Sequence, residues 1–255
     1  MAAGIGSRLE NISGNRPKCL IEMDGISLIS RSVSLLAARG ITDITVITGY
    51  KSELVQQELQ NRVSYLHNPY FEVTNSIASF WLAKELLYED LILMNADLYY
   101  ETAVLDTALA QSGNAVMLSD STRIIDADFR FGVAGDRILK TGNQLTDLET
   151  DCEYVGIVRI DKRFVERFRL RLEQMIKSGD FRNWWEGVLY SFIDEGVAIT
   201  HKDVEGAFWS EVDHLEDYNR LSSWISRPQQ AFTATRNKAQ PAGHLNGRGT
   251  PSTAV

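Results

Sequence analysis

Ala2-Ala3-Gly4-Ile5-Gly6-Ser7-Arg8-Leu9 is a short glycine loop near the start of the chain, and Arg16-Pro17-Lys18 follows it. Small residues let backbone N–H groups come close to an anion, and glycine tolerates the backbone angles that such a turn requires. The loop is not a dinucleotide fingerprint, because Leu9 stands where the third glycine belongs, and it lacks the Gly-Lys-Ser/Thr of a P-loop. The stretch is therefore either a plain structural turn or, as we predict, a grip for the phosphates of a nucleoside triphosphate.

Two kinds of contact with phosphate are predicted around this loop. Positive charge would come from Arg8 and Lys18, which we assign as catalytic residues. Backbone N–H contacts to the nucleotide would come from five small residues, which are Ala2, Ala3, Gly4, Gly6 and Ser7.

Helical and strand patterns alternate along the chain, which predicts an α/β fold built on a doubly wound, mainly parallel, Rossmann-like mixed sheet. Helices are expected over residues 27–39, 51–60, 75–87, 162–178, 183–194 and 214–225. Strands are expected over residues 43–49, 63–67, 90–97, 115–118, 129–134 and 154–160. In such sheets ligands bind outside the carboxyl ends of the strands, where Gly4, Gly49 and Asp97 are expected to converge.

The helix expected over residues 75–87 is amphipathic. Its apolar side chains recur at helical spacing, and we expect them all to be buried: Ile77, Phe80, Ala83, Leu86 and Leu87.

Size and composition indicate a single globular domain. The chain has 255 residues, of which 44% are hydrophobic and 24% are charged, which suits one large soluble domain. We expect this domain over residues 1–226. A disordered tail is expected over residues 227–255, because this segment is rich in proline and polar residues and has no apolar periodicity.

Charge and sequence signals also limit the location and the partners. The net charge of −8 disfavours a nucleic-acid partner. Neither a secretory leader nor an apolar run that could span a membrane is evident, so a cytoplasmic location is expected. Cys19 and Cys152 are too few for a disulfide framework or a zinc site and are interpreted as free thiols. The oligomeric state is left open.

Two aspartates are candidate metal ligands. Asp97 ends a buried apolar strand and offers the hard oxygen that Mg²⁺ prefers, although a strand-end aspartate can also simply cap the next turn. Asp213 opens Asp213-His214-Leu215-Glu216, which is equally a good capping box for the following helix. Both aspartates are predicted to hold Mg²⁺.

Further stretches give the chain a resemblance to a known family. They are Asn68-Pro69-Tyr70, the segment from Thr74 to Ala83, Asn95-Ala96-Asp97 and Glu211-Val212-Asp213. With the glycine loop, they resemble nucleotidyltransferases of the sugar-nucleotide pyrophosphorylase superfamily, in the branch of phosphocholine and 2-aminoethylphosphonate cytidylyltransferases. The similarity runs from Met1 to about Ile225.

The resemblance implies a nucleotide-diphospho-sugar transferase type of fold, CTP as the nucleotide and Mg²⁺ as the cofactor. It also implies that Asn75 and Ser79 face the nucleotide. In this superfamily the glycine loop follows a buried central strand of about five residues, whereas only Met1-Ala2-Ala3 precede it here. We therefore expect a truncated first strand and a sheet that is weaker for it.

Aromatic and acidic residues of the second half are candidates for binding an ammonium group of the substrate. An aromatic face beside a carboxylate attracts such a cation, although a tryptophan on a helix more often lies in the core. Because adjacent rings cannot both face the core, the pair Trp184-Trp185 is favoured for a contact. The predicted substrate residues are Tyr154, Trp184, Trp185, Glu186, Trp209 and Glu211.

The predicted activity is transfer of CMP from CTP to a small amine-bearing phosphate or phosphonate, of the phosphocholine or 2-aminoethylphosphonate class, with release of pyrophosphate. One alternative is a sugar-1-phosphate nucleotidyltransferase, which shares the loop and both aspartates. Another is a nucleotide-binding regulatory protein that has lost catalysis.

Overall fold

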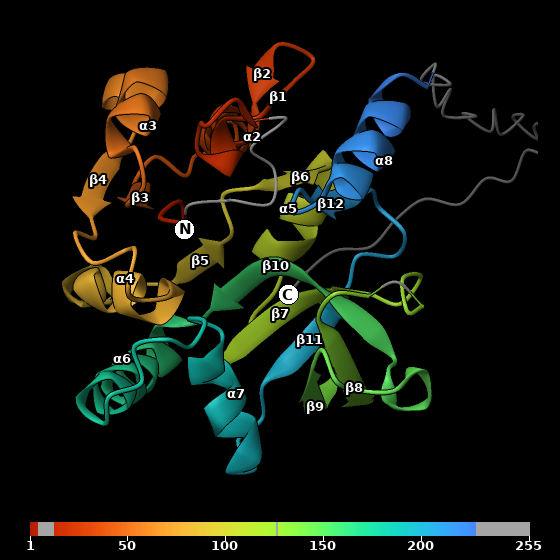
Figure 1. Cartoon of the computed structure of the whole chain (residues 1–255). Coiled ribbons are helices and arrows are strands. Elements are labelled where there is room, and N and C mark those ends of the chain that lie inside the picture. The colour runs from red at the N-terminus through yellow and green to blue at the C-terminus, as the bar shows by residue number, and fades with distance from the viewer. Residues whose placement is uncertain (5–12, 126, 228–255) are drawn as a thin grey trace, which may run out of the picture.

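A computed structural model of the chain describes residues 1–4, 13–125 and 127–227 (Figure 1). Its largest sheet has six strands in the order β5-β10-β7-β11-β9-β8. In chain order these are β5 (Leu91–Met94), β7 (Ala115–Asp120), β8 (Arg130–Ala134), β9 (Arg137–Gly142), β10 (Cys152–Ile160) and β11 (Thr200–Asp203). Strand β10 is antiparallel to β5 and β7, whereas β7 and β11 are parallel, so the sheet is mixed.

Three smaller strand pairs complete the fold. They are the parallel pair β3 (Thr45–Thr48) and β4 (Ser64–His67), the antiparallel pair β6 (Leu98–Tyr100) and β12 (Trp209–Glu211), and the hairpin of β1 (Glu22–Met23) and β2 (Ile26–Ser27). Helices connect them: α2 (Leu28–Ala37), α3 (Ser52–Leu59), α4 (Ser76–Leu82), α5 (Thr102–Leu109), α6 (Lys162–Lys177), α7 (Gly187–Asp194) and α8 (Leu215–Ile225), with short 3₁₀ turns at 18–20, 60–62, 84–86 and 147–149.

Helices cover both faces of the main sheet. Successive side chains of a strand point to opposite faces, and on β10 apolar side chains of both faces are buried against helices. On β10, Val158 and Ile160 join the core cluster that contains the buried face of α6. Ile157 points to the other face and joins the cluster that contains the buried residues of α5. This double covering confirms the expected α/β class.

The N-terminus lies in the middle of the molecule, next to β3 and β5 (Figure 1). Ala2 forms a parallel bridge with Thr48, and its N–H donates to the carbonyl of Ile47 at 2.8 Å. On the other side, the terminal ammonium of Met1 donates to the carbonyl of Met94 at 2.8 Å, and Ala96 N–H donates to the carbonyl of Met1 at 3.1 Å. The first residues thus occupy the position of a central parallel strand that joins the β4-β3 pair to β5.

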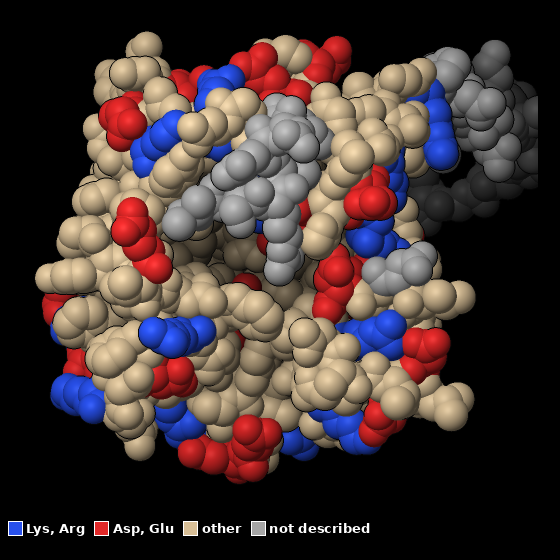
Figure 2. All heavy atoms as spheres, viewed as in Figure 1, with Lys and Arg blue, Asp and Glu red and all other residues tan. Residues whose placement is uncertain are grey.

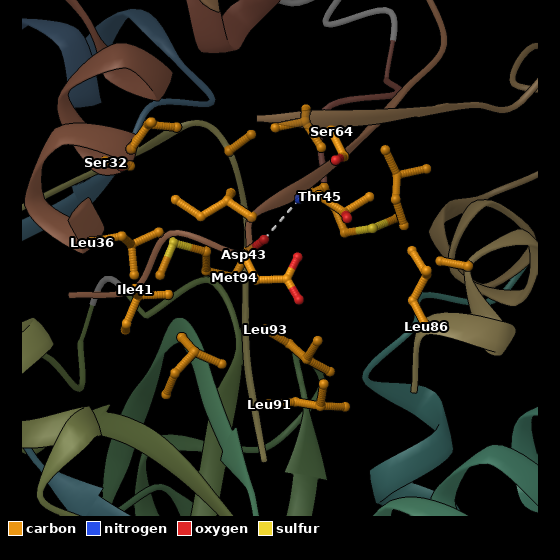
Figure 3. A pocket seen from close by; sticks show the side chains of 18 of the residues that line it. Ser32, Leu36, Ile41, Asp43, Thr45, Ser64, Leu86, Leu91, Leu93 and Met94 are labelled. Carbon is orange, nitrogen blue, oxygen red and sulfur yellow. Dashed lines mark hydrogen bonds between the residues drawn. The ribbon is translucent and has the colours of Figure 1, made fainter. Parts of the chain in front are cut away.

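A cavity of about 880 Å³ continues from Met1 between β3 and β5, and we call it the central slot. Figure 3 shows its lining, which includes Ile41, Thr45, Leu86, Leu91, Leu93 and Met94. Within the described residues, β3 pairs only with β4 and Ala2, and β5 pairs only with β10 and Met1. Most of the edge of each strand that faces the slot is therefore without a strand partner.

Leu86 corrects one prediction about the core. Of the five residues expected on the buried face of the segment 75–87, four are buried, but Leu86 is 44% exposed and lies at the slot. Helix α4 ends at Leu82, and the 3₁₀ turn that follows changes the angular spacing of the side chains, so Leu86 leaves the apolar stripe.

Candidate active site

A cleft of about 450 Å³ lies at the carboxyl ends of the first strand segment and β5. Figure 2 shows that this side of the molecule is hollowed near its centre, with acidic side chains visible in the hollow. Twelve of the predicted site residues line the cleft: Ala2, Ala3, Gly4, Lys18, Asn75, Ser79, Asp97, Tyr154, Trp184, Glu186, Glu211 and Asp213. Gly6, Ser7 and Arg8 lie outside the described residues.

Lys18 lies between two carboxylates of the cleft. Its ammonium is 2.7 Å from Oδ2 of Asp97 and also contacts Oδ1 of Asp213. Burial alone would lower the pKa of Lys18, but the two negative charges outweigh burial and raise it. Lys18 is therefore held as a fixed positive charge at the same place as the acidic residues.

Three carboxylates converge beside this lysine. Oxygens of Asp97, Glu211 and Asp213 all lie within 4.8 Å of one another. Burial, and then the charges of Asp97 and Asp213, raise the pKa of Glu211 well above its usual range. Hard oxygen donors at this spacing fit a divalent cation such as Mg²⁺, so the donor set suits the expected cofactor and adds Glu211 to the two predicted ligands.

Strand pairing brings these distant residues together. Glu211 lies opposite Leu98 in the antiparallel β6–β12 pair, and Val212 N–H donates to the carbonyl of Asp97 at 3.0 Å. The residue after Val212 is consequently delivered to the end of β5, beside Asp97. The short β6–β12 ladder thus brings together carboxylates that lie more than a hundred residues apart in the sequence.

The capping role considered for Asp213 is wrong. Helix α8 has His214 as its N-cap, and Asp217 completes the capping box. Oδ2 of Asp217 accepts from the N–H of Asp213 at 3.1 Å and from that of His214 at 2.9 Å. The capping box therefore begins one residue later than the sequence suggested, and this leaves the carboxylate of Asp213 for Lys18.

Asn75 and Ser79, which the resemblance implied to face the nucleotide, line the cleft in the first half of α4. Asn75 caps the helix, because its Oδ1 accepts from Ser76 N–H at 2.7 Å. The hydroxyl of Ser79 accepts from Nδ2 of Asn68 at 2.8 Å. Both side chains thus have structural partners, and their contact with a nucleotide stays a prediction.

Aromatic residues form the wall of another part of the cleft. The rings of Phe129 and Tyr190 are stacked, with centroids 5.1 Å apart and planes 9° apart. Trp184 is half exposed and meets Phe129 edge to face at 6.0 Å. Tyr154 lines the same cleft but is 7% exposed.

Glu186 places a buried carboxylate beside these rings. It precedes α7, is 7% exposed and lines the cleft. Burial raises its pKa to about 7, although a hydrogen bond with Asn95 and the terminal ammonium of Met1 act in the opposite direction. Asn95 also donates to Oε1 of Glu211 at 3.1 Å, so this amide lies between the two glutamates.

Trp185 and Trp209 are not substrate residues in this arrangement. Trp185 is 1% exposed and packs against Phe80 at 5.9 Å. Trp209 is 4% exposed, and its indole N–H donates to Oδ2 of Asp120 at 2.8 Å. Neither lines the cleft. Of the adjacent pair, only Trp184 faces outward, because successive side chains point in different directions.

Three further residues line the cleft that were not predicted as site residues: Phe129, Asp128 and Asn95, the last of which lies in the Asn95-Ala96-Asp97 motif. One signal was present for Phe129, since Phe129 and Phe131 are two residues apart in an expected strand and share one side. Phe131 fills the core, and Phe129 extends the same row to the cleft. We find no comparable signal for Asp128.

Comparison with known proteins agrees with this geometry. The model of the MobA-like NTP transferase domain family matches residues 1–136. A CMP-5'-(3-aminopropyl)phosphonate synthase of Streptomyces rubellomurinus is 33% identical over 250 residues, which cover 90% of this chain but only 39% of the relative. A choline-phosphate cytidylyltransferase of Streptococcus pneumoniae is 26% identical over 224 residues, which cover 87% of this chain and 94% of the relative.

The fold is shared with solved structures. A CTP:phosphocholine cytidylyltransferase from Streptococcus pneumoniae superposes with a TM-score of 0.73 at 23% identity, over 88% of this chain and 96% of the other. No helix within residues 1–4, 13–125 and 127–227 has the length and apolar character needed to cross a membrane.

The family match covers more than half of the chain, so the chain belongs to the MobA-like NTP transferase domain family and is a nucleotidyltransferase.

Proposed function

We propose that this nucleotidyltransferase transfers CMP from CTP to a small amine-bearing phosphate or phosphonate and releases pyrophosphate. The observation that carries the proposal is the composition of the cleft. A lysine and three carboxylates lie beside the small residues of the first loop, and aromatic rings with a buried glutamate line the same space. The first part suits a triphosphate with its metal ion, and the second suits an ammonium group.

In the proposed reaction an oxygen of the acceptor attacks the α-phosphorus of CTP. The new P–O bond forms as the bond to the β-phosphate breaks, and pyrophosphate leaves with the electron pair. The attacking oxygen is already an anion, so no residue has to remove a proton from it. The work of the protein is therefore to align two anions and to balance their charge.

Lys18 balances part of that charge at the reacting phosphates. The backbone of Ala2, Ala3 and Gly4 approaches the triphosphate, because no large side chain stands in the way. Asp97, Asp213 and Glu211 would hold Mg²⁺, which when bound would polarise phosphate oxygens.

The relatives support CTP as the nucleotide and a phosphate or phosphonate as the acceptor. A sugar-1-phosphate acceptor is less favoured, because the part of the cleft that holds Glu186 is walled by the rings of Phe129, Trp184 and Tyr190, which suit an ammonium group better than sugar hydroxyls. A regulator without catalysis is disfavoured by the assembled contacts of Lys18 with Asp97 and Asp213.

The kcat/KM for CTP is expected to be at least about tenfold higher than for UTP, ATP or GTP. A site that recognises a base by hydrogen bonds usually rejects the wrong base by a larger factor than this. Pyrophosphate release measures this with each nucleotide in the presence of phosphocholine, 2-aminoethylphosphonate or glucose 1-phosphate. Equal kcat/KM with all four nucleotides would contradict the proposal.

Asp97→Asn and Asp213→Asn are each expected to raise the Mg²⁺ concentration for half-maximal rate by at least about tenfold. Substituting even a residue that only hydrogen-bonds to a metal ligand lowers metal affinity by about that factor, and a direct ligand should matter at least as much. Titration of the rate with Mg²⁺ measures the effect. Asp106→Asn is the matched control, since Asp106 is an exposed aspartate that pairs with Arg39 and lies outside the carboxylate cluster. An unchanged Mg²⁺ requirement in Asp213→Asn would remove that residue from the proposed ligands.

A further inference from the structure

The aromatic part of the cleft contains a hydroxyl group without a hydrogen-bond partner. Tyr154 belongs to the central strand β10 and is 7% exposed, and its hydroxyl oxygen finds no partner among the described residues. A buried hydroxyl that makes no hydrogen bond lowers stability. Such a group at the wall of a ligand cleft points to a partner that the ligand supplies.

Glu186 faces the same space. Burial raises the pKa of the Tyr154 phenol well above its usual range, and the nearby carboxyl groups of Glu186 and Glu211 act in the same direction. The terminal ammonium of Met1 acts on Glu186, but it already donates to the carbonyl of Met94.

The described lining of the cleft contains no lysine or arginine besides Lys18, and Lys18 is held by Asp97 and Asp213. The carboxylate of Glu186 therefore lacks a cationic side chain of its own in the described part of the cleft.

The surrounding groups define the kind of cation that fits. The ring faces of Phe129, Trp184 and Tyr190 attract a cation of any type. A carboxylate and a phenol hydroxyl do more, because they accept hydrogen bonds from N–H groups. A quaternary ammonium has no N–H, so it would leave the Tyr154 hydroxyl without a partner, and Glu186 would keep only the hydrogen bonds that it already makes within the protein.

We propose that Tyr154 and Glu186 select an acceptor with a primary ammonium over one with a quaternary ammonium. This inference rests on the proposed function, since it specifies the acceptor for the same cleft. It makes the two residues specificity determinants: the rings supply general attraction, and the hydroxyl and the carboxylate distinguish an N–H from a methyl group.

The test compares 2-aminoethylphosphonate with its N,N,N-trimethyl analogue, which keeps the positive charge but carries three methyl groups in place of the three N–H hydrogens. In the unmodified chain, kcat/KM with CTP should be at least about 30-fold higher for the primary amine, since a site built for hydrogen bonds rejects a ligand that lacks them. Tyr154→Phe and Glu186→Gln should each lower the value for the primary amine by about tenfold or more. Tyr154→Phe should change the value for the trimethyl analogue less than twofold. Glu186→Gln should lower the value for the trimethyl analogue less than it lowers the value for the primary amine, because the charge of the carboxylate attracts either cation and only the hydrogen bond is specific for N–H. Tyr88→Phe is the matched control, because Tyr88 is exposed and does not line the cleft.

Calorimetric binding of the same two phosphonates separates this inference from the proposed function. If no nucleotide is turned over, the proposed function fails, and the ratio of the two dissociation constants still decides the selection. Equal or tighter binding of the trimethyl analogue overturns the inference. An equal loss for both ligands in Tyr154→Phe also overturns it for that residue, because a merely structural hydroxyl would not distinguish them.

Discussion

Lys18→Ala is expected to lower turnover by at least about two orders of magnitude, which is the usual cost of removing one group that stabilises transition-state charge. In the proposed reaction negative charge builds up between two anionic partners, and Lys18 is the positive side chain that the described part of the cleft brings to that place. Its effect should fall mainly on kcat, because the charge to be balanced is greatest in the transition state.

The structure adds a second consequence of this substitution. Without the lysine, Asp97, Glu211 and Asp213 would face one another with no positive side chain between them. The melting temperature of Lys18→Ala should therefore fall in a chelator and recover partly when Mg²⁺ is added, because a divalent ion can take over the role of counterion.

Steady-state kinetics at saturating Mg²⁺ measures the first effect, and thermal unfolding in a chelator and then in saturating Mg²⁺ measures the second. Lys162→Ala is the matched control, because Lys162 is an exposed lysine that also pairs with a carboxylate, Glu89, at 2.7 Å. Near-normal turnover of Lys18→Ala, or a loss of activity that only follows unfolding, would refute the assigned role.

Five aliphatic residues added ahead of Met1 are expected to raise the melting temperature by at least about 8 °C, at 2–4 °C per kcal/mol for a domain of this size. Met1 and Ala2 already lie in parallel register with β5 and β3, so an extension would enter the central slot. Each fully buried aliphatic side chain contributes about 1.5–3 kcal/mol. Backbone hydrogen bonds to both strands would add to this.

The terminal ammonium of Met1 adds to the expected gain. It is buried, and burial lowers its pKa, so the charged form is disfavoured where it stands. Joining it to a preceding residue turns it into a neutral amide that can make the same hydrogen bond to Met94. Binding of CTP should also tighten, because the glycine loop continues from this strand.

An extension of five glycine and serine residues is the control, because it has the same length but no apolar side chains. Leu86→Glu gives a second check. Leu86 is half exposed at the slot, so the substitution should cost little in the chain as it stands and much more in the extended chain. Equal melting temperatures for the aliphatic and the polar extension would show that the slot does not take a strand.

Local patterns in the sequence predicted most elements of the fold. Helix α6 runs over Lys162–Lys177 against an expectation of 162–178, because its apolar residues recur with helical spacing and Asp161 caps its start. The strand β10 and the helix α8 were also found close to their predicted positions. These elements depend on information that lies within a dozen residues.

Errors arose where the outcome depends on distant partners. Trp209 is an aromatic residue of the kind that binds ligands, but its indole N–H donates to Asp120 instead. No pattern near Trp209 in the sequence indicates that contact. In the same way, only the β6–β12 register brings Glu211 and Asp213 to Asp97. The residue types of the candidate site could be predicted from the sequence, but their division between cleft and core could not.

The side-chain amide of Asn95 is held in one orientation between the cleft and the core. Its Oδ1 accepts from the indole N–H of Trp185 at 3.4 Å, and because an indole can only donate, the amide cannot turn round. The NH₂ group is therefore held toward Glu211 and Glu186. Trp185 does not line the cleft, yet its indole decides that the buried acids Glu211 and Glu186 meet the NH₂ group of Asn95 and not its oxygen.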